Sequence, residues 1–303
     1  MKIVISILHF NNDADTIDCL NSILKLDLRS INIETHILDN GSAKKFVIDA
    51  TLYKKINLVI SRSNINTGFT GGHNLVYEKV KDQQFDYFLI LNNDSLLEKN
   101  SIYELAQSMS EGHVGAVVPK IYFTKGREFH KDRYKKSDTG NVLWYAGGKI
   151  DWNNVMSRHT GVNEVDTGQF DISHEVDFAT GACLLLKKEL IRKIGFFNDK
   201  YFLYYEDADL SVRIIRSGYT ILYQPKAILW HNNAGSSASG SALHDYYLTR
   251  NRILFGMKYA PFKMKVHLVI ENTRLIFFGR EWQKKGIRDY FIRNFGKGSY
   301  IKD

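Results

Sequence analysis

Residues that could carry out chemistry stand at three places where an apolar segment of the chain ends. Asn92-Asn93-Asp94 follows the apolar run 85–91, the acidic pair Glu206-Asp207 comes much later, and His231 follows Trp230. A carboxylate at a strand tip, a second acidic pair and a late histidine suit a divalent cation, a diphosphate and a proton acceptor. The same residue types also form ordinary turns, so Asn92-Asn93-Asp94 alone does not decide between the two interpretations.

Asp94 is the first candidate for holding a hard cation, Mg²⁺ or Mn²⁺, because these ions prefer carboxylate oxygen. A diphosphate would fill other positions around the ion, which would neutralise charge on a departing nucleoside diphosphate. His231 offers a neutral imidazole that suits a Mn²⁺ ligand set. A histidine hydrogen-bonded beneath Trp230 is the alternative.

Asp207 is the candidate general base. It stands at the start of a predicted helix, where the helix dipole stabilises a carboxylate. Glu206 beside it makes a pair whose protonation states can be pushed apart by their surroundings. Capping of the helix by acidic residues is the alternative.

The elements that would position these residues alternate between strand and helix. Strands are predicted at 2–8, 31–38, 56–61, 86–91 and 114–118, and helices from Asp13 and at 43–53, 75–81 and 101–110. Such units require a mostly parallel sheet that is covered on both faces. A polar, charged segment at 121–173 interrupts the pattern, and strands at 176–178, 181–186 and 219–223 and helices from Lys188 and at 206–217 follow.

Four loops are expected at the carboxyl edge of this sheet, where open α/β sheets bind nucleotides. They contain His9-Phe10-Asn11, Asp39-Asn40-Gly41-Ser42, the segment 64–74 and Asn92-Asn93-Asp94. Phe10 is expected near the base plane, and Asp39 is expected to accept from a base N–H or a ribose hydroxyl. Glycines of the third loop, such as Gly71, let the backbone approach a ligand closely. The loop matches neither a dinucleotide-binding nor a P-loop pattern, and Asp39–Ser42 is also compatible with a simple tight turn.

Bulk properties limit the architecture. The chain has 303 residues, is 44% apolar and contains three prolines, which fits one large α/β domain with an appendage. We expect a catalytic domain at residues 1–245 and a helical C-terminal extension at 246–303. Cys19 and Cys183 are predicted to be buried packing residues in a reducing compartment. No secretory leader and no bilayer-spanning apolar run is visible, so a cytoplasmic protein is expected.

The C-terminal extension carries the positive charge of the chain. From Thr249 to Asp303 there are 13 Lys and Arg and 4 Asp and Glu, whereas the rest has 28 and 29. Bulky apolar residues such as Phe262, Phe277 and Trp282 are mixed with these charges. This pattern is typical of contact with an anionic membrane surface, at the inner face of the cell membrane. A solvated basic face, a nucleic-acid contact or a second subunit are the alternatives, although we expect no nucleic-acid function.

The ordered series of motifs resembles the family-two nucleotide-sugar glycosyltransferases with the GT-A fold, particularly a rhamnosyltransferase-like subgroup. The resemblance covers roughly residues 1 to 260 and rests on the order of the motifs more than on any one of them. The matching segments are Ile7-Leu8-His9-Phe10-Asn11, Asp39-Asn40-Gly41-Ser42, Asn64-x-Asn66-x-Gly68-Phe69-x-Gly71-Gly72-x-Asn74, Leu91-Asn92-Asn93-Asp94, Thr180-Gly181-Ala182, Tyr204-x-Glu206-Asp207-x-Asp209-Leu210-x-x-Arg213 and Trp230-His231-x-x-x-Gly235-Ser236.

The resemblance implies a role for each motif. The first three segments would bind the nucleotide, Asn92-Asn93-Asp94 would correspond to the Asp-x-Asp element for metal and diphosphate, and Asp207 would be the base. Asn92 replaces the first aspartate of that element, which removes one charge from the ligand set. Gly181 would lie near the donor or acceptor sugar. The subgroup favours dTDP-L-rhamnose as donor, with UDP-hexoses next, and a glycan or lipid-linked acceptor in cell-surface polysaccharide synthesis.

Two other functions fit part of the pattern. A sugar nucleotidyltransferase would share the sheet and the metal-bound aspartate, but it usually needs a basic Gly-rich loop where this chain has His9-Phe10-Asn11. An inactive nucleotide-sugar or membrane-binding module would not need Asp94, Asp207 and His231 together. The sequence therefore favours an inverting, metal-dependent glycosyltransferase.

Overall fold

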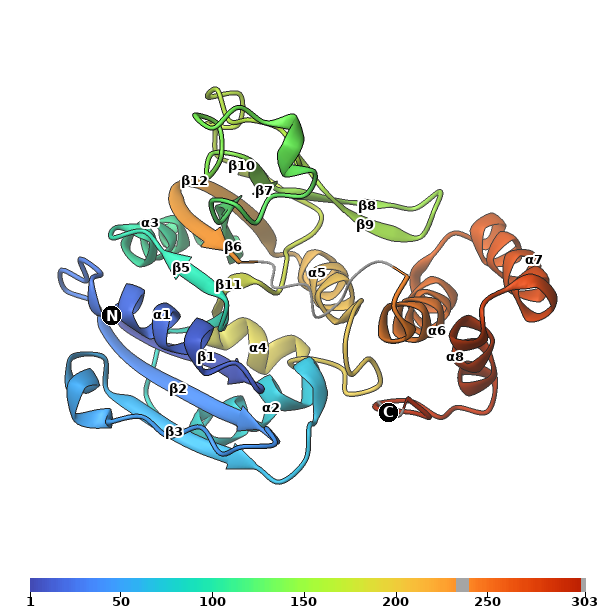
Figure 1. The fold of residues 1–303 in the computed structure, drawn as a ribbon, viewed down its shortest axis with the longest axis horizontal. Coiled ribbons are helices and arrows are strands. Elements are labelled where there is room, and N and C mark those ends of the chain that lie inside the picture. Colours follow the sequence, from blue (N-terminus) through green and yellow to red (C-terminus); the bar gives the residue numbers. More distant parts are fainter. Residues whose placement is uncertain (233–239, 301–303) are drawn as a thin grey trace.

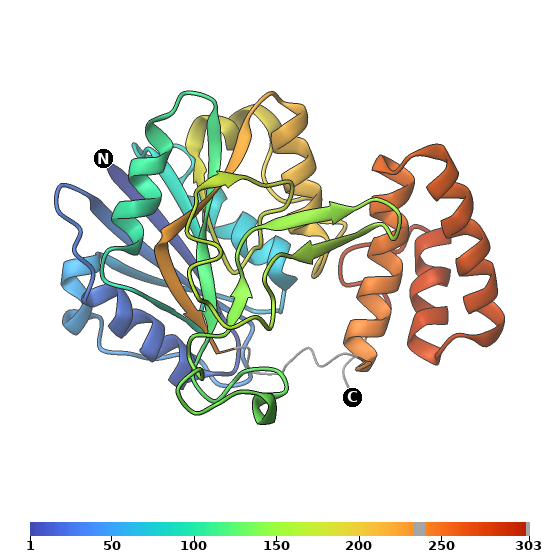
Figure 2. The same cartoon turned by 90° about the horizontal axis from the view of Figure 1, so that it is seen from above.

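The computed structural model describes residues 1–232 and 240–300, so Gly235 and Ser236 of the last motif lie outside the described residues. One large sheet with helices on both faces forms most of the molecule, and three C-terminal helices stand beside it (Figures 1 and 2). Helices α1 (Asp13–Leu24) and α3 (Ser101–Gln107) lie on one side of the sheet. On the other side are α2 (Gly68–Val80), α4 (Lys188–Ile194) and α5 (Glu206–Arg216).

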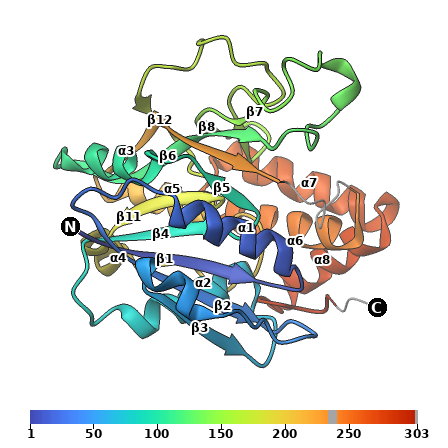
Figure 3. The same cartoon turned by 60° about the vertical axis from the view of Figure 1, so that its left-hand side comes forward.

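The sheet is mixed and mostly parallel, as the strand–helix alternation predicts. Its main strands run in the order β10-β12-β6-β11-β4-β1-β2-β3, and Figure 3 shows the part from β11 to β3. Strands β1 to β4 are mutually parallel where they pair, β12 is parallel to β6, and β11 is antiparallel to both neighbours. The bounds are β1 Lys2–His9, β2 Asn32–Asn40, β3 Leu58–Ser63, β4 Tyr87–Asn92, β6 Val114–Phe123, β10 His174–Glu175, β11 Cys183–Lys187 and β12 Thr220–His231.

Four further short strands lie near the β6 and β12 side of the sheet. Strand β5 (Ser95–Leu97) pairs with β12, and β7 (Leu143–Tyr145) pairs with β6. Strands β8 (Gly148–Asp151) and β9 (Met156–His159) form a separate hairpin that reaches toward the C-terminal helices (Figure 2). The segment 121–173, where the strand–helix alternation stops, therefore contains short strands of its own.

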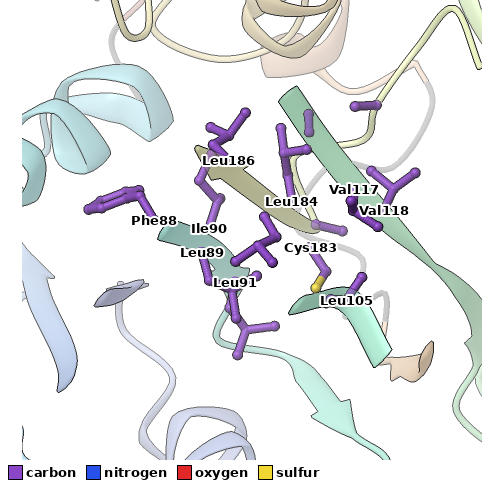
Figure 4. Close-up of a cluster of buried hydrophobic side chains, with 14 of the residues drawn as sticks. Phe88, Leu89, Ile90, Leu91, Leu105, Val117, Val118, Cys183, Leu184 and Leu186 are labelled. Atoms are coloured by element: carbon purple, nitrogen blue, oxygen red, sulfur yellow. The ribbon is translucent and has the colours of Figure 1, made fainter. Parts of the chain in front are cut away.

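The core of the sheet lies between β4 and β11. Phe88, Leu89, Ile90 and Leu91 are fully buried and meet the leucines of β11 (Figure 4). The continuous apolar run follows from the covering of both faces, and burial of each such side chain contributes about 1.5–3 kcal/mol. Cys19 and Cys183 are free thiols buried in this core, as predicted.

Several element boundaries differ from the predicted ones. Helix α2 begins at Gly68 rather than Leu75, because Asn66 Oδ1 accepts from the Gly68 amide at 2.8 Å and starts the helix early. Residues 43–53 form no α-helix, and a 3₁₀ segment occupies Ala50–Ile56. Residues 176–178 are not a strand. Strand β12 continues beyond Pro225 because its register shifts between Gln224 and Ile228, which accommodates a residue without an N–H.

The C-terminal extension consists of α6 (Ala242–Tyr259), α7 (Phe262–Phe278) and α8 (Glu281–Phe291), which pack on one another (Figure 1). Because α6 begins at Ala242, the expected boundary between residues 245 and 246 falls within its first turn. Among the described residues, no helix is both long and apolar enough to cross a membrane.

Asp209 of α5 joins the extension to the sheet domain. Its carboxylate is fully buried and accepts from Arg213 Nε at 2.7 Å, Tyr259 OH at 2.8 Å and Lys258 Nζ at 2.9 Å. Burial alone would raise the pKa of Asp209, but the charges of Arg213 and Lys258 outweigh it, so the pKa is lowered. Two of these three partners, Lys258 and Tyr259, lie on α6.

We predict that Asp209→Ala destabilises the protein strongly, because it leaves the buried Tyr259 hydroxyl and the partly buried Arg213 guanidinium without their acceptor. The expected loss is roughly 3–5 kcal/mol in the free energy of unfolding, measured by urea titration. Glu281→Ala is the control, since it removes an exposed ion pair with Lys285 on α8 and should cost less than about 1 kcal/mol. Equal losses for both variants would contradict the role given to Asp209.

Candidate active site

The ends of β4 and β12 bring together three of the predicted site residues. Pairing of β12 with β5 sets His231 opposite Ser95, directly after Asn92-Asn93-Asp94. His231 Nε2 lies 3.1 Å from Asp94 Oδ1 and 3.3 Å from Asn92 Nδ2. Asn93 turns to the other side and donates to Thr16 Oγ1 at 2.9 Å, which ties the loop to α1.

His231 is buried on the face of β12 opposite Trp230, because successive side chains of a strand alternate. Its ring packs against Trp144, with 4.6 Å between ring centroids, so it does not lie beneath Trp230. Its Nδ1 atom is buried and has no hydrogen-bond partner within the described ranges. Trp230 instead donates to the Gly140 carbonyl at 3.2 Å and stacks on Tyr122.

The donor atoms fit a divalent cation that is held jointly with a ligand. An imidazole nitrogen and a carboxylate oxygen already face each other, and they suit Mn²⁺ or Mg²⁺ chemically. In residues 1–232 and 240–300 no group of three or more His, Cys, Asp or Glu is placed to hold a metal. The protein therefore supplies few ligands of its own, and the oxygens of a bound diphosphate would have to complete the shell.

The first two predicted nucleotide loops are held together by their own side chains. Asp39 accepts from the amides of Ser42 at 2.9 Å and Phe46 at 3.1 Å and pairs with Arg62. Burial opposes ionisation of Asp39, but these hydrogen bonds outweigh it and lower its pKa. Arg62, which also donates to the Ser42 carbonyl at 2.7 Å, was not predicted; it stands in β3 with no motif around it.

At the end of β1, one residue is buried in the packing of the domain and the next is exposed. His9 is fully buried, stacks on Phe46 and shares a 2.8 Å hydrogen bond with Thr16 Oγ1. Asn11 Oδ1 accepts from the Ala43 amide at 2.8 Å. The ring of Phe10 is 41% exposed, so it is open to a ligand in a way that His9 is not.

The third predicted loop is shorter than expected because α2 occupies much of it. Asn64 is exposed, whereas Asn66 is engaged at the start of the helix. Gly71 lies within the helix, where a Cβ atom would stand 2.9 Å from Thr67 Cβ. Its small size thus serves close packing of the first turn. The amides of that turn are already engaged, because Gly68 donates to Asn66 Oδ1 at 2.8 Å and Phe69 to the Phe202 carbonyl at 2.7 Å, so they are not open to an anionic group.

The acidic pair lies at the start of α5. Asp207 Oδ1 accepts from the Ala208 amide at 2.9 Å, and Oδ2 lies 3.4 Å from the Gly181 amide. Burial raises the pKa of Asp207 to about 6. Glu206 is more deeply buried, and one of its oxygens has no hydrogen-bond partner in the described part of the chain. Burial and then the charge of Asp207 raise the pKa of Glu206 well above its usual range, so Glu206 is neutral where Asp207 ionises.

Gly181 fits closely between the acidic pair and α2. A Cβ atom there would stand 2.9 Å from the Phe69 ring, so a side chain would push α2 away. The structure thus brings Gly181, Glu206 and Asp207 together.

A cleft of about 710 Å³ lies between this acidic pair and the C-terminal helices. Aromatic residues of the sheet domain form one wall, and polar residues of α6, α7 and α8 form the other. The residues used below are Trp144, Phe178, Tyr204, Asp245, Arg252, Glu271 and Arg280. Sequence reasoning named only Tyr204 among them, because the others have no motif. A hollow of about 910 Å³ between α2 and α4 contains, of the predicted nucleotide segments, Asn74, which donates to the Phe197 carbonyl and to Asp199 there.

The fold and the order of these motifs match the GT-A architecture. The model of the family described as glycosyl transferase family 2 matches residues 4–195, so the chain belongs to that family. An N-acetylglucosaminyl-diphospho-decaprenol L-rhamnosyltransferase of Mycobacterium tuberculosis is 35% identical over 69 residues, 23% of this chain and 22% of that enzyme. A low-salt glycan biosynthesis hexosyltransferase, Agl10, of Haloferax volcanii is 21% identical over 71% of this chain and 67% of its own.

Solved structures confirm the fold class. GalNAc-T7 with UDP, GalNAc and Mn²⁺ matches with a TM-score of 0.61 and 12% identity, over 90% of this chain and 57% of its own. S. aureus TarS 1-349 matches with a TM-score of 0.54 and 14% identity, over 100% of this chain and 76% of its own. The GT-A architecture predicted from the motif order is therefore confirmed.

We predict that Asp207→Asn lowers sugar transfer by about 10²–10⁴-fold, the usual contribution of a general base. Nucleotide binding should be nearly unchanged, because the base acts on the barrier and not on ground-state affinity. Asp82→Asn, in the hollow between α2 and α4, is the matched control and should retain activity. Near-wild-type turnover of Asp207→Asn would move the base elsewhere, with Asp209 or Glu206 next.

The rate should also depend on pH in a defined direction. Only the deprotonated Asp207 accepts a proton, so kcat should fall as the pH drops through about 6, the raised pKa of this carboxyl. The measurement is a pH profile of kcat at saturating donor and acceptor. An acid limb that stays near the ordinary aspartate value of about 4 would contradict the assignment.

Proposed function

We propose that the protein is an inverting glycosyltransferase that moves a sugar from a nucleoside-diphosphate sugar to a hydroxyl of a glycan or lipid-linked acceptor. The observation that carries this is Asp207, a carboxylate with a raised pKa between the donor edge of the sheet and the cleft. In a single displacement the acceptor oxygen bonds to the anomeric carbon, the bond from that carbon to the diphosphate oxygen breaks, and the acceptor proton passes to Asp207.

The donor would lie along the carboxyl edge of the sheet. Phe10 is open to the base, and the loops shaped by Asn11 and Asp39 are preformed around it. We assign donor binding to Phe10, Asn11, Asp39, Asn64, Asn66, Gly71, Asn92, Asn93, Gly181 and Glu206. His9 is fully buried and would support the loop by packing on Phe46, without touching the donor. The donor sugar is dTDP-rhamnose or a UDP-hexose. The mycobacterial relative is named for L-rhamnose transfer, and a TarS structure is a complex with UDP-GlcNAc. Release of dTDP or UDP from a panel of nucleotide sugars would identify the donor.

Asp94 and His231 would hold Mg²⁺ or Mn²⁺ together with the donor diphosphate. When bound, the cation supplies positive charge that stabilises the departing diphosphate. Two solved relatives in fold, GalNAc-T7 and a mannosyltransferase of Pyrobaculum calidifontis, were determined with Mn²⁺. The few protein ligands predict that cation and donor bind cooperatively.

The acceptor would occupy the cleft beside Asp207. Trp144, Phe178 and Tyr204 offer aromatic rings for the apolar faces of a sugar, and the buried oxygens of Glu206 and Glu271 that lack partners within the described residues would meet hydroxyl donors. Arg252 pairs with Glu271 at 2.7 Å, and Arg280 pairs with Asp245. The opposite charges within each pair cancel, so this wall of the cleft is polar without net charge and suits a hydroxyl-rich acceptor sugar.

The outer face of α7 fits the interface of an anionic membrane that carries such an acceptor. Its apolar side chains are open to solvent, with Phe262 82%, Ile270 64% and Phe277 68% exposed. At helical spacing these residues share one face, and the exposed Lys263 and Arg274 flank it. The inner face contributes Glu271 and Leu275 to the cleft, so a lipid-anchored sugar could enter from the membrane side. A second copy of the chain covering this face is the alternative.

Membership of glycosyl transferase family 2 favours sugar transfer over the sugar nucleotidyltransferase alternative. Measured turnover of the donor distinguishes the proposed enzyme from an inactive module that only binds a nucleotide sugar or a membrane. Release of nucleoside diphosphate that depends on both Asp207 and an acceptor would exclude a module that only binds nucleotide sugar.

We predict that transfer requires a divalent cation and stops in excess EDTA, with recovery on addition of Mn²⁺ or Mg²⁺. Asp94→Ala should lower kcat/KM by at least about 10²-fold, because the diphosphate then leaves without its fixed counter-charge. Asp82→Ala serves again as the distant control. Full activity in EDTA would reduce Asn92-Asn93-Asp94 to a polar loop that binds phosphate directly.

We predict that the full chain sediments with vesicles rich in anionic lipid at low salt and less so at high salt. Each basic residue near the surface contributes about 1 kcal/mol, and salt screens that contribution. Phe277→Ser with Ile270→Ser should abolish sedimentation while transfer to a water-soluble acceptor is unchanged. Val47→Ser, at an exposed apolar residue of the sheet domain, is the control. No sedimentation at any salt, together with a dimer in solution, would make α7 a subunit interface.

A further inference from the structure

The loop before the acidic pair has an unusual backbone. Phe202, Tyr204 and Tyr205 all have left-handed conformations, with φ values of 66°, 67° and 70°. A side chain in this region crowds the following carbonyl, so bulky residues rarely adopt it, and three within four residues require support from outside the loop. Glu206 and Asp207 follow immediately, so the position of the carboxyl pair depends on this loop.

Two fully buried polar residues of α6 hold the loop in place. The Asn251 side-chain nitrogen lies 2.9 Å from the Tyr201 carbonyl, 2.8 Å from that of Leu203 and 2.9 Å from that of Tyr204. Arg250 Nη2 donates to the Tyr201 carbonyl at 2.9 Å and the Lys200 carbonyl at 3.2 Å. These carbonyls belong to no helix or strand, and the two side chains of α6 donate to all of them, beside the amides of Leu203 and Gly296, which also donate to the Tyr201 and Lys200 carbonyls.

The side chains of the clamp are themselves fixed. Arg250 Nε donates to Asn251 Oδ1 at 2.9 Å, which orients the amide with its nitrogen toward the loop. The guanidinium lies near the rings of Tyr246 and Tyr247, 5.3 and 5.1 Å from their centroids. Tyr247 in turn stacks on Phe202, with 5.1 Å between centroids. The clamp is therefore rigid and contacts the loop through both backbone and ring.

The same loop also touches the donor side of the site. The Phe202 carbonyl accepts from the Phe69 amide at 2.7 Å at the first turn of α2. Gly68 allows this contact, because a Cβ atom there would stand 2.4 Å from the Phe202 carbonyl oxygen. The loop thus joins α2, α5 and α6, and a shift of it would move Asp207 relative to the donor.

We propose that Arg250 and Asn251 are positioning residues for the transfer reaction. They act by holding the loop 201–205, in which Phe202, Tyr204 and Tyr205 are left-handed, in the conformation that places Asp207. This inference rests on the proposed function, in which Asp207 is the base. It gives the C-terminal extension a part in catalysis that is separate from any contact with membrane or acceptor.

The test compares Asn251→Ala and Asn251→Asp with wild type. Asn251→Asp keeps the shape of the side chain but turns its donor nitrogen into an oxygen that faces three carbonyls, so it breaks the clamp without leaving a cavity, whereas Asn251→Ala does both. We expect kcat to fall by about 10²-fold in both variants, as for a displaced catalytic group, with donor affinity within about twofold of wild type. The acid limb of the kcat profile should also move below the wild-type position, because a loosened loop admits water to Asp207 and relieves the effect of burial.

Asn294→Ala is the matched control, because this asparagine donates to Asp289 and Ser299 within the extension and its side chain does not reach the loop in the described contacts. It should retain kcat and the acid limb. Arg250→Lys is the milder second variant if Asn251 variants do not fold, and it should show the same loss of kcat with a folded circular-dichroism spectrum. Wild-type kcat and acid limb in Asn251→Asp, or in Arg250→Lys where only that variant folds, would overturn the clamp. If Asp207→Asn is inactive in the same assay, the proposed function would still stand.

Discussion

Burial of two adjacent carboxyl groups at the start of α5 is the constraint on which the site depends. A buried carboxylate is unfavourable unless hydrogen bonds or charges stabilise it. Asp207 receives amide contacts from Ala208 and Gly181 and lies at the positive end of the helix dipole. Glu206 has a buried oxygen without a partner in the described residues, and it responds by remaining protonated. The close approach of Gly181 and the left-handed loop both follow from the need to enclose this pair.

The C-terminal extension is structurally part of the catalytic unit, although its composition suggested a separate basic tail. Much of its positive charge is used internally: Lys258 pairs with Asp209, Arg252 with Glu271 and Arg280 with Asp245. Arg250 is fully buried and donates to the carbonyls of Lys200 and Tyr201 in the loop before α5. A count of charges along the sequence includes such residues together with the exposed Lys263 and Arg274, so it overstates the charge that is available to a membrane. The apolar face of α7 is consequently the stronger support for a docking surface.

Sequence reasoning identified the strand ends well, because a buried strand and the polar residues at its tip are both local patterns. Asn92, Asp94 and His231 meet as expected, since parallel strands deliver their tips to one edge. It failed where long-range contacts decide the local structure. Helix α2 starts at Gly68, where Asn66 Oδ1 accepts from the Gly68 amide and the Phe202 carbonyl accepts from the Phe69 amide, and neither contact is visible in helical periodicity. The register shift that lets β12 continue past Pro225 is likewise set by its partner β6.

Arg250 and Asn251 show a second limit of the same kind. In a helix that carries many charged residues, an Arg-Asn pair is compatible with a solvated face, and only the fold shows both side chains to be fully buried. The left-handed backbone of Phe202, Tyr204 and Tyr205 cannot be inferred from their residue types. The only sequence feature at this place is a run of bulky residues just before a helix start.

The raised pKa of Asp207 gives this enclosure a chemical purpose. A carboxylate with an ordinary pKa is ionised at neutral pH but is a weak base, whereas one raised far above neutrality would be protonated and unable to accept. A pKa of about 6 lies between these limits, and the amide contacts keep it from rising as far as that of Glu206. Enclosure by the loop and by α6 raises the basicity, and the amides of Gly181 and Ala208 limit the rise. Burial and the two amide contacts must act on the same carboxylate. Asp207 therefore has to keep its position, and the loop before it is held by several hydrogen bonds from α6.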